Sequence, residues 1–139
     1  MSIYLDASVV VSLFVADAHS ARAMGLQTVG ETLAISDLTS AEFASALSLQ
    51  HRRGKLAGEQ ARRLLSAFDN WRELETERME VLPSDVRGAE AIIRRLDNPL
   101  RTADAMHLVI ARRLGATLAT FDQAMARAAP DLGVPLATL

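Results

Sequence analysis

The sequence predicts a three-layer α/β fold, in which a mostly parallel sheet of short strands lies between flanking helices. Short runs of apolar and β-branched residues recur along the chain, and stretches with helical periodicity separate them. Strands that alternate with helices are typical of βαβ units, whose crossover helices pack on the faces of a parallel sheet. The chain has 139 residues, and we expect one domain that spans residues 1–139.

The expected strands are short, and they end at turn-forming or polar residues. They cover residues 3–5, 33–36, 79–82 and 117–121. Residues 135–138 predict a further strand at an edge of the sheet, where a proline is tolerated.

The expected helices carry apolar side chains at helical spacing. They cover approximately residues 8–15, 19–29, 39–53, 57–74, 84–96, 102–114 and 122–129. Gly54 and Gly115 stand where two of these helices end. Asp122 is a good N-cap for the last of them.

The composition excludes several classes of protein. The chain has no cysteine, which rules out disulfides, Cys-ligated zinc, iron–sulfur clusters and thiolate nucleophiles. Hydrophobic residues make up 50% and charged residues 23%, as in an ordinary globular domain rather than a disordered chain. The net charge of -2 excludes a protein that holds nucleic acid by bulk positive charge, although local basic patches remain possible.

The N-terminal segment lacks the features of a signal peptide or a membrane anchor. It has no basic region, and Asp6 stands where a signal peptide is apolar. The apolar run 7–16 is much shorter than the roughly 20 residues that span a bilayer. We therefore expect a soluble, cytoplasmic protein.

Four acidic residues are expected at one edge of the sheet. Asp6 and Asp122 each follow a strand, whereas Glu42 and Asp104 lie in the first turns of helices. In a parallel α/β sheet, the carboxyl ends of strands and the N-termini of the following helices share one edge, where ligands bind. Three of the acids therefore converge, and Asp104 joins them if its helix begins at that edge.

Each acid also has a structural interpretation. Asp6 and Asp122 can cap helices, Thr39 and Glu42 have the spacing of a capping box, and Asp104 suits the dipole at a helix N-terminus. Four carboxylates at one edge nevertheless repel each other and raise each other's pKa. A bound divalent cation would remove this repulsion.

An oxygen-only set of ligands favours Mg²⁺ or Mn²⁺ over zinc, because the chain offers neither cysteine nor paired histidines. Such a cation can activate water and stabilise the leaving oxygen of a phosphodiester. The pattern therefore favours cleavage of a nucleic acid strand.

Four segments resemble motifs of the PIN-domain nucleases, and among these the VapC toxins of type II toxin–antitoxin modules. They are Tyr-Leu-Asp-Ala-Ser at 4–8, Ser-Ala-Glu-Phe at 40–43, Thr-Ala-Asp-Ala-Met-His-Leu at 102–108 and Leu-Ala-Thr-Phe-Asp at 118–122. The resemblance extends over essentially the whole chain in order, spacing and length.

This resemblance implies a parallel sheet between helices, a Mg²⁺- or Mn²⁺-dependent endoribonuclease, and a cognate VapB-type antitoxin in a homodimer or dimer-based complex. By motif, the catalytic and metal-binding residues would be Asp6, Glu42, Asp104 and Asp122. Ser8 and Thr120 match supporting hydroxyl positions, where they would orient a carboxylate or hold a metal-bound water.

Other side chains are candidates for contact with RNA or a partner protein. They are Arg52, Arg53, Lys55, Arg101 and His107. Arginine suits bidentate phosphate contacts, but most of the arginine doublets are also explained as solvated helix faces. A histidine at the position of His107 more often packs or hydrogen-bonds structurally.

The apolar stripe of Leu64, Leu65, Phe68 and Trp71 has two interpretations. Core packing is the first, and a groove for an amphipathic antitoxin helix is the second. The function also has alternatives: a non-catalytic PIN-like module that binds RNA or a partner, and a receiver-type domain in which Asp6 accepts a phosphoryl group.

Overall fold

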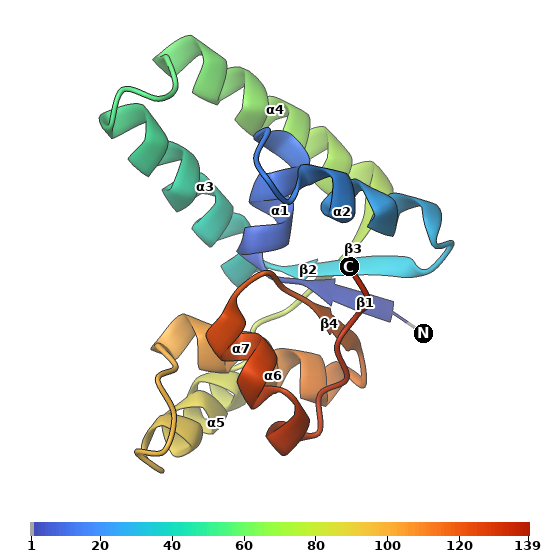
Figure 1. Cartoon of the computed structure of the whole chain (residues 1–139), viewed down its shortest axis with the longest axis vertical. Coiled ribbons are helices and arrows are strands. Elements are labelled where there is room, and N and C mark those ends of the chain that lie inside the picture. The colour runs from blue at the N-terminus through green and yellow to red at the C-terminus, as the bar shows by residue number, and fades with distance from the viewer. Residues whose placement is uncertain (1) are drawn as a thin grey trace.

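The computed structural model describes residues 2–139, and within this range four strands form one parallel sheet (Figure 1). The strands are β1 (Ser2–Leu5), β2 (Thr32–Ser36), β3 (Thr76–Met79) and β4 (Thr117–Ala119). Their order across the sheet is β3-β2-β1-β4, so β1 pairs in parallel with both β2 and β4. The predicted fold class is confirmed.

Helices cover both faces of the sheet (Figure 1). Four of those described lie on one face: α1 (Ala7–Phe14), α2 (Ser20–Gly25), α3 (Asp37–Arg52) and α4 (Gly58–Glu75). The opposite face carries α5 (Pro83–Ile93), α6 (Thr102–Leu114) and α7 (Gln123–Ala128). Short 3₁₀ turns follow α2 at Leu26–Thr28 and α7 at Pro130–Leu132.

The core is divided by the sheet because successive strand residues point to opposite faces. Tyr4 faces α5 and α6, together with Leu118, in one buried cluster. Ile3 and Leu5 face the other way and pack in a second cluster with Phe43 of α3. Burial on both faces explains why the central strands are nearly continuous apolar runs.

The aromatic stripe of α4 belongs to this second cluster. The Phe68 ring lies 4.5 Å from the Phe43 ring between centroids, and the Trp71 ring lies 5.5 Å from that of Phe14. Phe68 and Trp71 are both buried, and Leu64 and Leu65 are half-buried against the same cluster. The interpretation of the stripe as core packing is therefore confirmed.

Three of the expected strands were wrong in position or extent, and the one expected at 117–121 ends at Ala119. The third strand covers Thr76–Met79 rather than 79–82, because it pairs with β2 at an exposed edge where Glu77 and Arg78 can face solvent. Apolar periodicity does not detect such a strand. The expected strand at 135–138 is reduced to one parallel bridge between Leu136 and Leu118.

Helix α3 begins two residues before the predicted start at Thr39. Ser36 is its N-cap, and Ser36 and Thr39 form the capping box that had been assigned to Thr39 and Glu42. None of the helices within residues 2–139 combines the length and apolar character needed to cross a membrane.

An ion pair joins α5 to α6. Arg113 donates from Nε to Asp85 Oδ1 over 2.8 Å and from Nη2 to Asp85 Oδ2 over 2.9 Å. Burial alone would raise the pKa of Asp85, but hydrogen bonds from Arg113 and the Leu82 backbone hold it below its ordinary value. The charged form of this buried carboxylate therefore stabilises the fold.

We expect Asp85→Asn to lower the free energy of unfolding by about 1–3 kcal/mol at neutral pH, because Arg113 loses its charged partner. Since the folded pKa is depressed, this stabilisation is complete above the unfolded value of about 3.9 and disappears as pH falls through the folded pKa. Urea denaturation at pH 7 and at about pH 3 measures this. The difference in free energy of unfolding between variant and wild type should be smaller at the lower pH.

Glu90→Gln is the matched control, because it removes the pair with Arg94 on the same helix, where both side chains are exposed. If Glu90→Gln lowers the free energy of unfolding as much as Asp85→Asn does, the ion pair between α5 and α6 has no special role in stability.

Candidate functional site

A cleft of about 230 Å³ opens at the carboxyl edge of the sheet, and all four predicted acids line it. Asp6 comes from the end of β1 and Asp122 from the loop after β4, whereas Glu42 and Asp104 come from α3 and α6. The N-terminus of α6 lies at this edge, which meets the condition for Asp104 to join the others.

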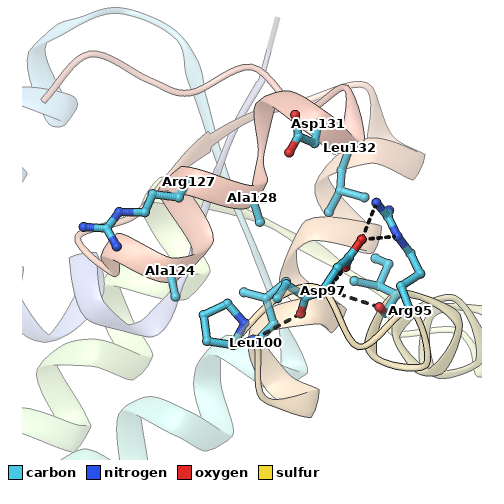
Figure 2. A pocket seen from close by; sticks show the side chains of 11 residues that line it. Arg95, Asp97, Leu100, Ala124, Arg127, Ala128, Asp131 and Leu132 are labelled. Carbon is cyan, nitrogen blue, oxygen red and sulfur yellow. Dashed lines mark hydrogen bonds and ion pairs between the residues drawn. The ribbon is translucent and has the colours of Figure 1, made fainter.

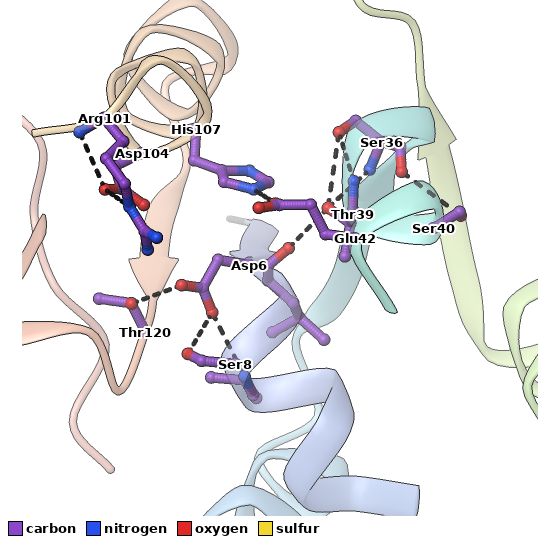
Figure 3. A network of polar contacts seen from close by, with 12 residues as sticks. Asp6, Ser8, Ser36, Thr39, Ser40, Glu42, Arg101, Asp104, His107 and Thr120 are labelled. Atoms are coloured by element: carbon purple, nitrogen blue, oxygen red, sulfur yellow. Dashed lines mark hydrogen bonds and ion pairs between the residues drawn. The ribbon is translucent and has the colours of Figure 1, made fainter. Parts of the chain in front are cut away.

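Asp6 is the most enclosed of these carboxylates, with 2% of its surface exposed. Its Oδ1 accepts hydrogen bonds from Ser8 Oγ at 2.6 Å and from the Val9 backbone at 3.3 Å (Figure 3). Its Oδ2 accepts from Thr120 Oγ1 at 2.6 Å. Ser8 and Thr120, predicted as supporting residues, therefore fix the orientation of this carboxylate.

Burial raises the pKa of Asp6, and the hydrogen bonds from Ser8 and Thr120 offset part of that rise. The protein thus holds this carboxyl group in an environment that disfavours its charge. A cation in the cleft would favour the ionised form.

The same hydroxyl groups connect the loop after β4 to the start of α1. Ser8 Oγ accepts from the Phe121 backbone and Thr120 Oγ1 accepts from the Asp122 backbone, both at 2.9 Å. Asp122 also caps α7 by accepting from the Met125 backbone at 2.9 Å. Its predicted capping role and its place in the cleft are therefore compatible.

Asp104 and Arg101 form the side of the cleft at the start of α6. Asp104 Oδ2 accepts from the Arg101 backbone at 3.1 Å and lies 3.5 Å from its Nε (Figure 3). Asp104 is 6% exposed, whereas the Arg101 side chain is 83% exposed. Arg101 thus lies beside the acids, paired with Asp104 and exposed to solvent.

Glu42 lies one turn inside α3, where it does not serve the capping box expected with Thr39. Its carboxylate instead meets His107 Nε2, while His107 Nδ1 lies 2.7 Å from the Tyr4 hydroxyl. The predicted contact of His107 with RNA or a partner is wrong, because only 1% of the side chain is exposed. The structural role considered for this histidine is the one observed, but its partners Glu42 and Tyr4 depend on tertiary packing, which spacing along the chain does not reveal.

The other basic candidates lie away from the acids. Arg52, Arg53 and Lys55 are exposed where α3 turns into α4, at the end of the helical hairpin remote from the sheet (Figure 1). The structure does not bring them to the cleft, and their contact with RNA or a partner stays a prediction.

The donors of the cleft fit a hard divalent cation. Asp6, Glu42, Asp104 and Asp122 offer carboxylate oxygens, and Mg²⁺ accepts such ligands while keeping several waters. Within residues 2–139, however, no three acidic or histidine side chains converge closely enough to form a finished metal cage. A cation here would therefore rely on water and substrate for part of its coordination.

A second hollow, of about 270 Å³, lies between the α5–α6 loop and α7 (Figure 2). Its charged groups partly neutralise each other, since Arg95 Nη2 lies 3.1 Å from Asp97 Oδ2. Asp131 and Arg127 also line it. Because it contains none of the four predicted acids, the carboxylate cleft is the better candidate for chemistry.

Residues 3–130 match the PIN domain family. The chain is 26% identical over 135 residues to Ribonuclease VapC3 of Pyrobaculum aerophilum, and the alignment covers 97% of this chain and 100% of that protein.

Solved structures share the fold. VapC20 of Mycobacterium tuberculosis, a Sarcin-Ricin loop cleaving toxin, superposes with a TM-score of 0.72 at 21% identity, over 91% of this chain and 94% of that one. VapBC2 of Rickettsia felis, bound to a DNA fragment from its promoter, gives a TM-score of 0.72 at 17% identity, over 100% and 99% of the two chains.

We expect Thr120→Val to raise the pKa of Asp6 further, because the variant removes a hydrogen bond that favours the charged carboxylate. A ¹³C NMR titration of the Asp6 carboxyl group in metal-free protein measures this directly. Thr138→Val is the control, since Thr138 is exposed near the C-terminus. An unchanged or lower Asp6 pKa in Thr120→Val would show that the hydroxyl does not stabilise the charge.

Proposed function

Because the chain belongs to the PIN-domain family, we propose that it is the toxin of a VapBC-type toxin–antitoxin system and a Mg²⁺- or Mn²⁺-dependent endoribonuclease. The observation that carries this proposal is the placement of Asp6, Glu42, Asp104 and Asp122 around one cleft. The likeness to Ribonuclease VapC3 supports it.

In the proposed reaction, these four carboxylates hold one or two divalent cations. When bound, the cation supplies Lewis-acid chemistry, which favours ionisation of water and neutralises charge on the scissile phosphate. Ser8 and Thr120 keep both oxygens of Asp6 in fixed directions. In this proposal Arg101, whose side chain is exposed at the rim, would contact a phosphate of the RNA.

The proposal includes a VapB-type antitoxin as partner and a homodimer or dimer-based complex. Its support is that structurally similar chains occur in VapBC2 of Rickettsia felis and in a FitAB complex bound to a DNA fragment. A cytoplasmic location belongs to the same proposal, because RNA and antitoxin would meet the enzyme there. The likeness to PIN domains favours this chemistry over phosphoryl acceptance by Asp6.

The alternative function is a non-catalytic PIN-like module that binds RNA or a partner. The observation that favours it is that the described carboxylates do not converge into a finished metal cage. The two functions differ in whether RNA is cut.

We expect purified protein, free of any partner, to cut RNA with Mg²⁺ or Mn²⁺, and Asp6→Asn to reduce the cleavage rate by at least about 100-fold through loss of a metal ligand. Incubation with total cellular RNA, with and without EDTA, measures this. RNA binding by the variant should persist in a gel-shift assay.

Glu59→Gln is the control, because it removes an exposed carboxylate from the start of α4. Cleavage by wild type that survives EDTA, or equal cleavage by Asp6→Asn, would contradict the metal mechanism. RNA binding without cleavage by wild type would favour the non-catalytic module.

We also expect Mg²⁺ or Mn²⁺ to stabilise the wild-type fold, because the cation offsets repulsion among the acids. At a metal concentration 100 times the Kd, mass action adds about 2.7 kcal/mol, which raises the Tm by about 5–10 °C. Thermal denaturation of wild type and Asp6→Asn tests this. An equal shift in both proteins would place the bound metal elsewhere.

A further inference from the structure

A buried series of hydrogen bonds leads from the core to the carboxylate of Glu42. The Ser36 hydroxyl lies 2.7 Å from the Tyr4 hydroxyl, which lies 2.7 Å from His107 Nδ1. His107 Nε2 then contacts Glu42 (Figure 3). Ser36, Tyr4 and His107 are at most 1% exposed, whereas 34% of the Glu42 side chain is exposed at the cleft.

The carboxylate of Glu42 constrains the nearest donor of this series. An ionised Glu42 carboxylate can only accept, so His107 must donate from Nε2. If Nδ1 carries no proton it accepts from the Tyr4 hydroxyl, and if it carries one it donates to the Tyr4 oxygen, so the contact exists in either case. Burial raises the pKa of Tyr4 and so keeps its proton in place.

The far end of the series can adapt to either direction. A Tyr4 hydroxyl that donates to His107 can accept from Ser36, and one that accepts from His107 can donate to Ser36. Thr39 Oγ1 lies 3.0 Å from the Leu5 carbonyl, to which it donates. The hydroxyl groups around Tyr4 therefore do not compete for His107.

We propose that Tyr4 and His107 are positioning residues, which hold the Glu42 carboxylate at the cleft through the hydrogen bond that His107 donates from Nε2. Their importance for metal binding rests on the proposed function. The hydrogen-bond direction and the ordering of Glu42 are properties of the metal-free protein.

The location of the series supports a role beyond packing. Tyr4 is on β1, Glu42 on α3 and His107 on α6, so the series connects the central strand with helices on both faces. The polar groups of its buried residues form hydrogen bonds with one another, and the series reaches solvent at Glu42. A glutamate has several rotatable bonds, and loss of the His107 donor would free it to leave the cleft.

The first experiment measures the His107 tautomer. Long-range ¹H–¹⁵N NMR of metal-free wild type distinguishes a protonated from an unprotonated ring nitrogen. We expect a proton on Nε2. An Nε2 without a proton would overturn the proposal, whatever the protein does to RNA.

The second experiment compares Tyr4→Phe, His107→Gln and His107→Asn. We expect Mn²⁺ affinity, measured by the EPR signal of free Mn²⁺, to fall about 10–100-fold in His107→Asn, as for other supporting contacts of metal ligands. His107→Gln should retain more affinity, because its amide can reach Glu42 in place of Nε2. In Tyr4→Phe the Mn²⁺ affinity should fall about 3–10-fold, since this variant keeps the aromatic ring but removes the hydrogen bond at Nδ1 of His107.

Val109→Ala is the control for loss of packing, because Val109 is a buried apolar residue of the same helix. In metal-free protein, ¹³C relaxation of the Glu42 side chain should report increased motion in Tyr4→Phe and His107→Asn, but not in Val109→Ala. Circular dichroism confirms that each variant is folded.

These readouts separate the inference from the proposed function. If the Glu42 side chain is as ordered in Tyr4→Phe and His107→Asn as it is in wild type, the inference is overturned, even if the enzyme cuts RNA. Increased Glu42 motion in a protein that neither binds Mn²⁺ nor cuts RNA would support the positioning role and reject the proposed function.

Discussion

The parallel pairing of β1 with both β2 and β4 is the constraint on which the rest of the site depends. It aligns the carboxyl ends of these strands at one edge, so Asp6 lies beside Thr120, although 114 positions separate them. The hydrogen bond between these residues then joins the two ends of the chain at the cleft. A shift of one residue in the register of β4 would turn Thr120 to the opposite face of the sheet and remove this contact.

Helix capping and the candidate chemistry use the same side chains. Asp6 and Asp122 accept hydrogen bonds from the first turns of α1 and α7, and Asp104 accepts from the backbone at the start of α6. The structural and functional interpretations of these acids were therefore not alternatives. Helix N-termini carry partial positive charge, which makes this edge a favourable place to gather carboxylates before a cation is present.

The sequence allowed the central parts of this arrangement to be predicted, because they follow from local patterns. Buried strands and amphipathic helices have clear periodicity, and strand ends located Asp6 and Asp122. The edge strand β3 was misplaced because Glu77 and Arg78 face solvent and give no apolar signal. The start of α3 was misplaced because Ser36 both ends β2 and caps the helix, so no loop separates the two elements. The environment of His107 was missed because it depends on Tyr4 and Glu42 lying close in space, which spacing along the chain does not reveal.

Glu42 differs from the other acids in how the fold supports it. Asp6, Asp104 and Asp122 accept hydrogen bonds from nearby backbone groups at helix N-termini. Glu42 lies farther into α3, where backbone N–H groups already have intrahelical partners. Its support must come from another element, and His107 of α6 provides it. The position of this acid therefore depends on how α6 packs across the sheet edge, so changes in that packing would alter Glu42 before they alter the acids held by their own helix starts.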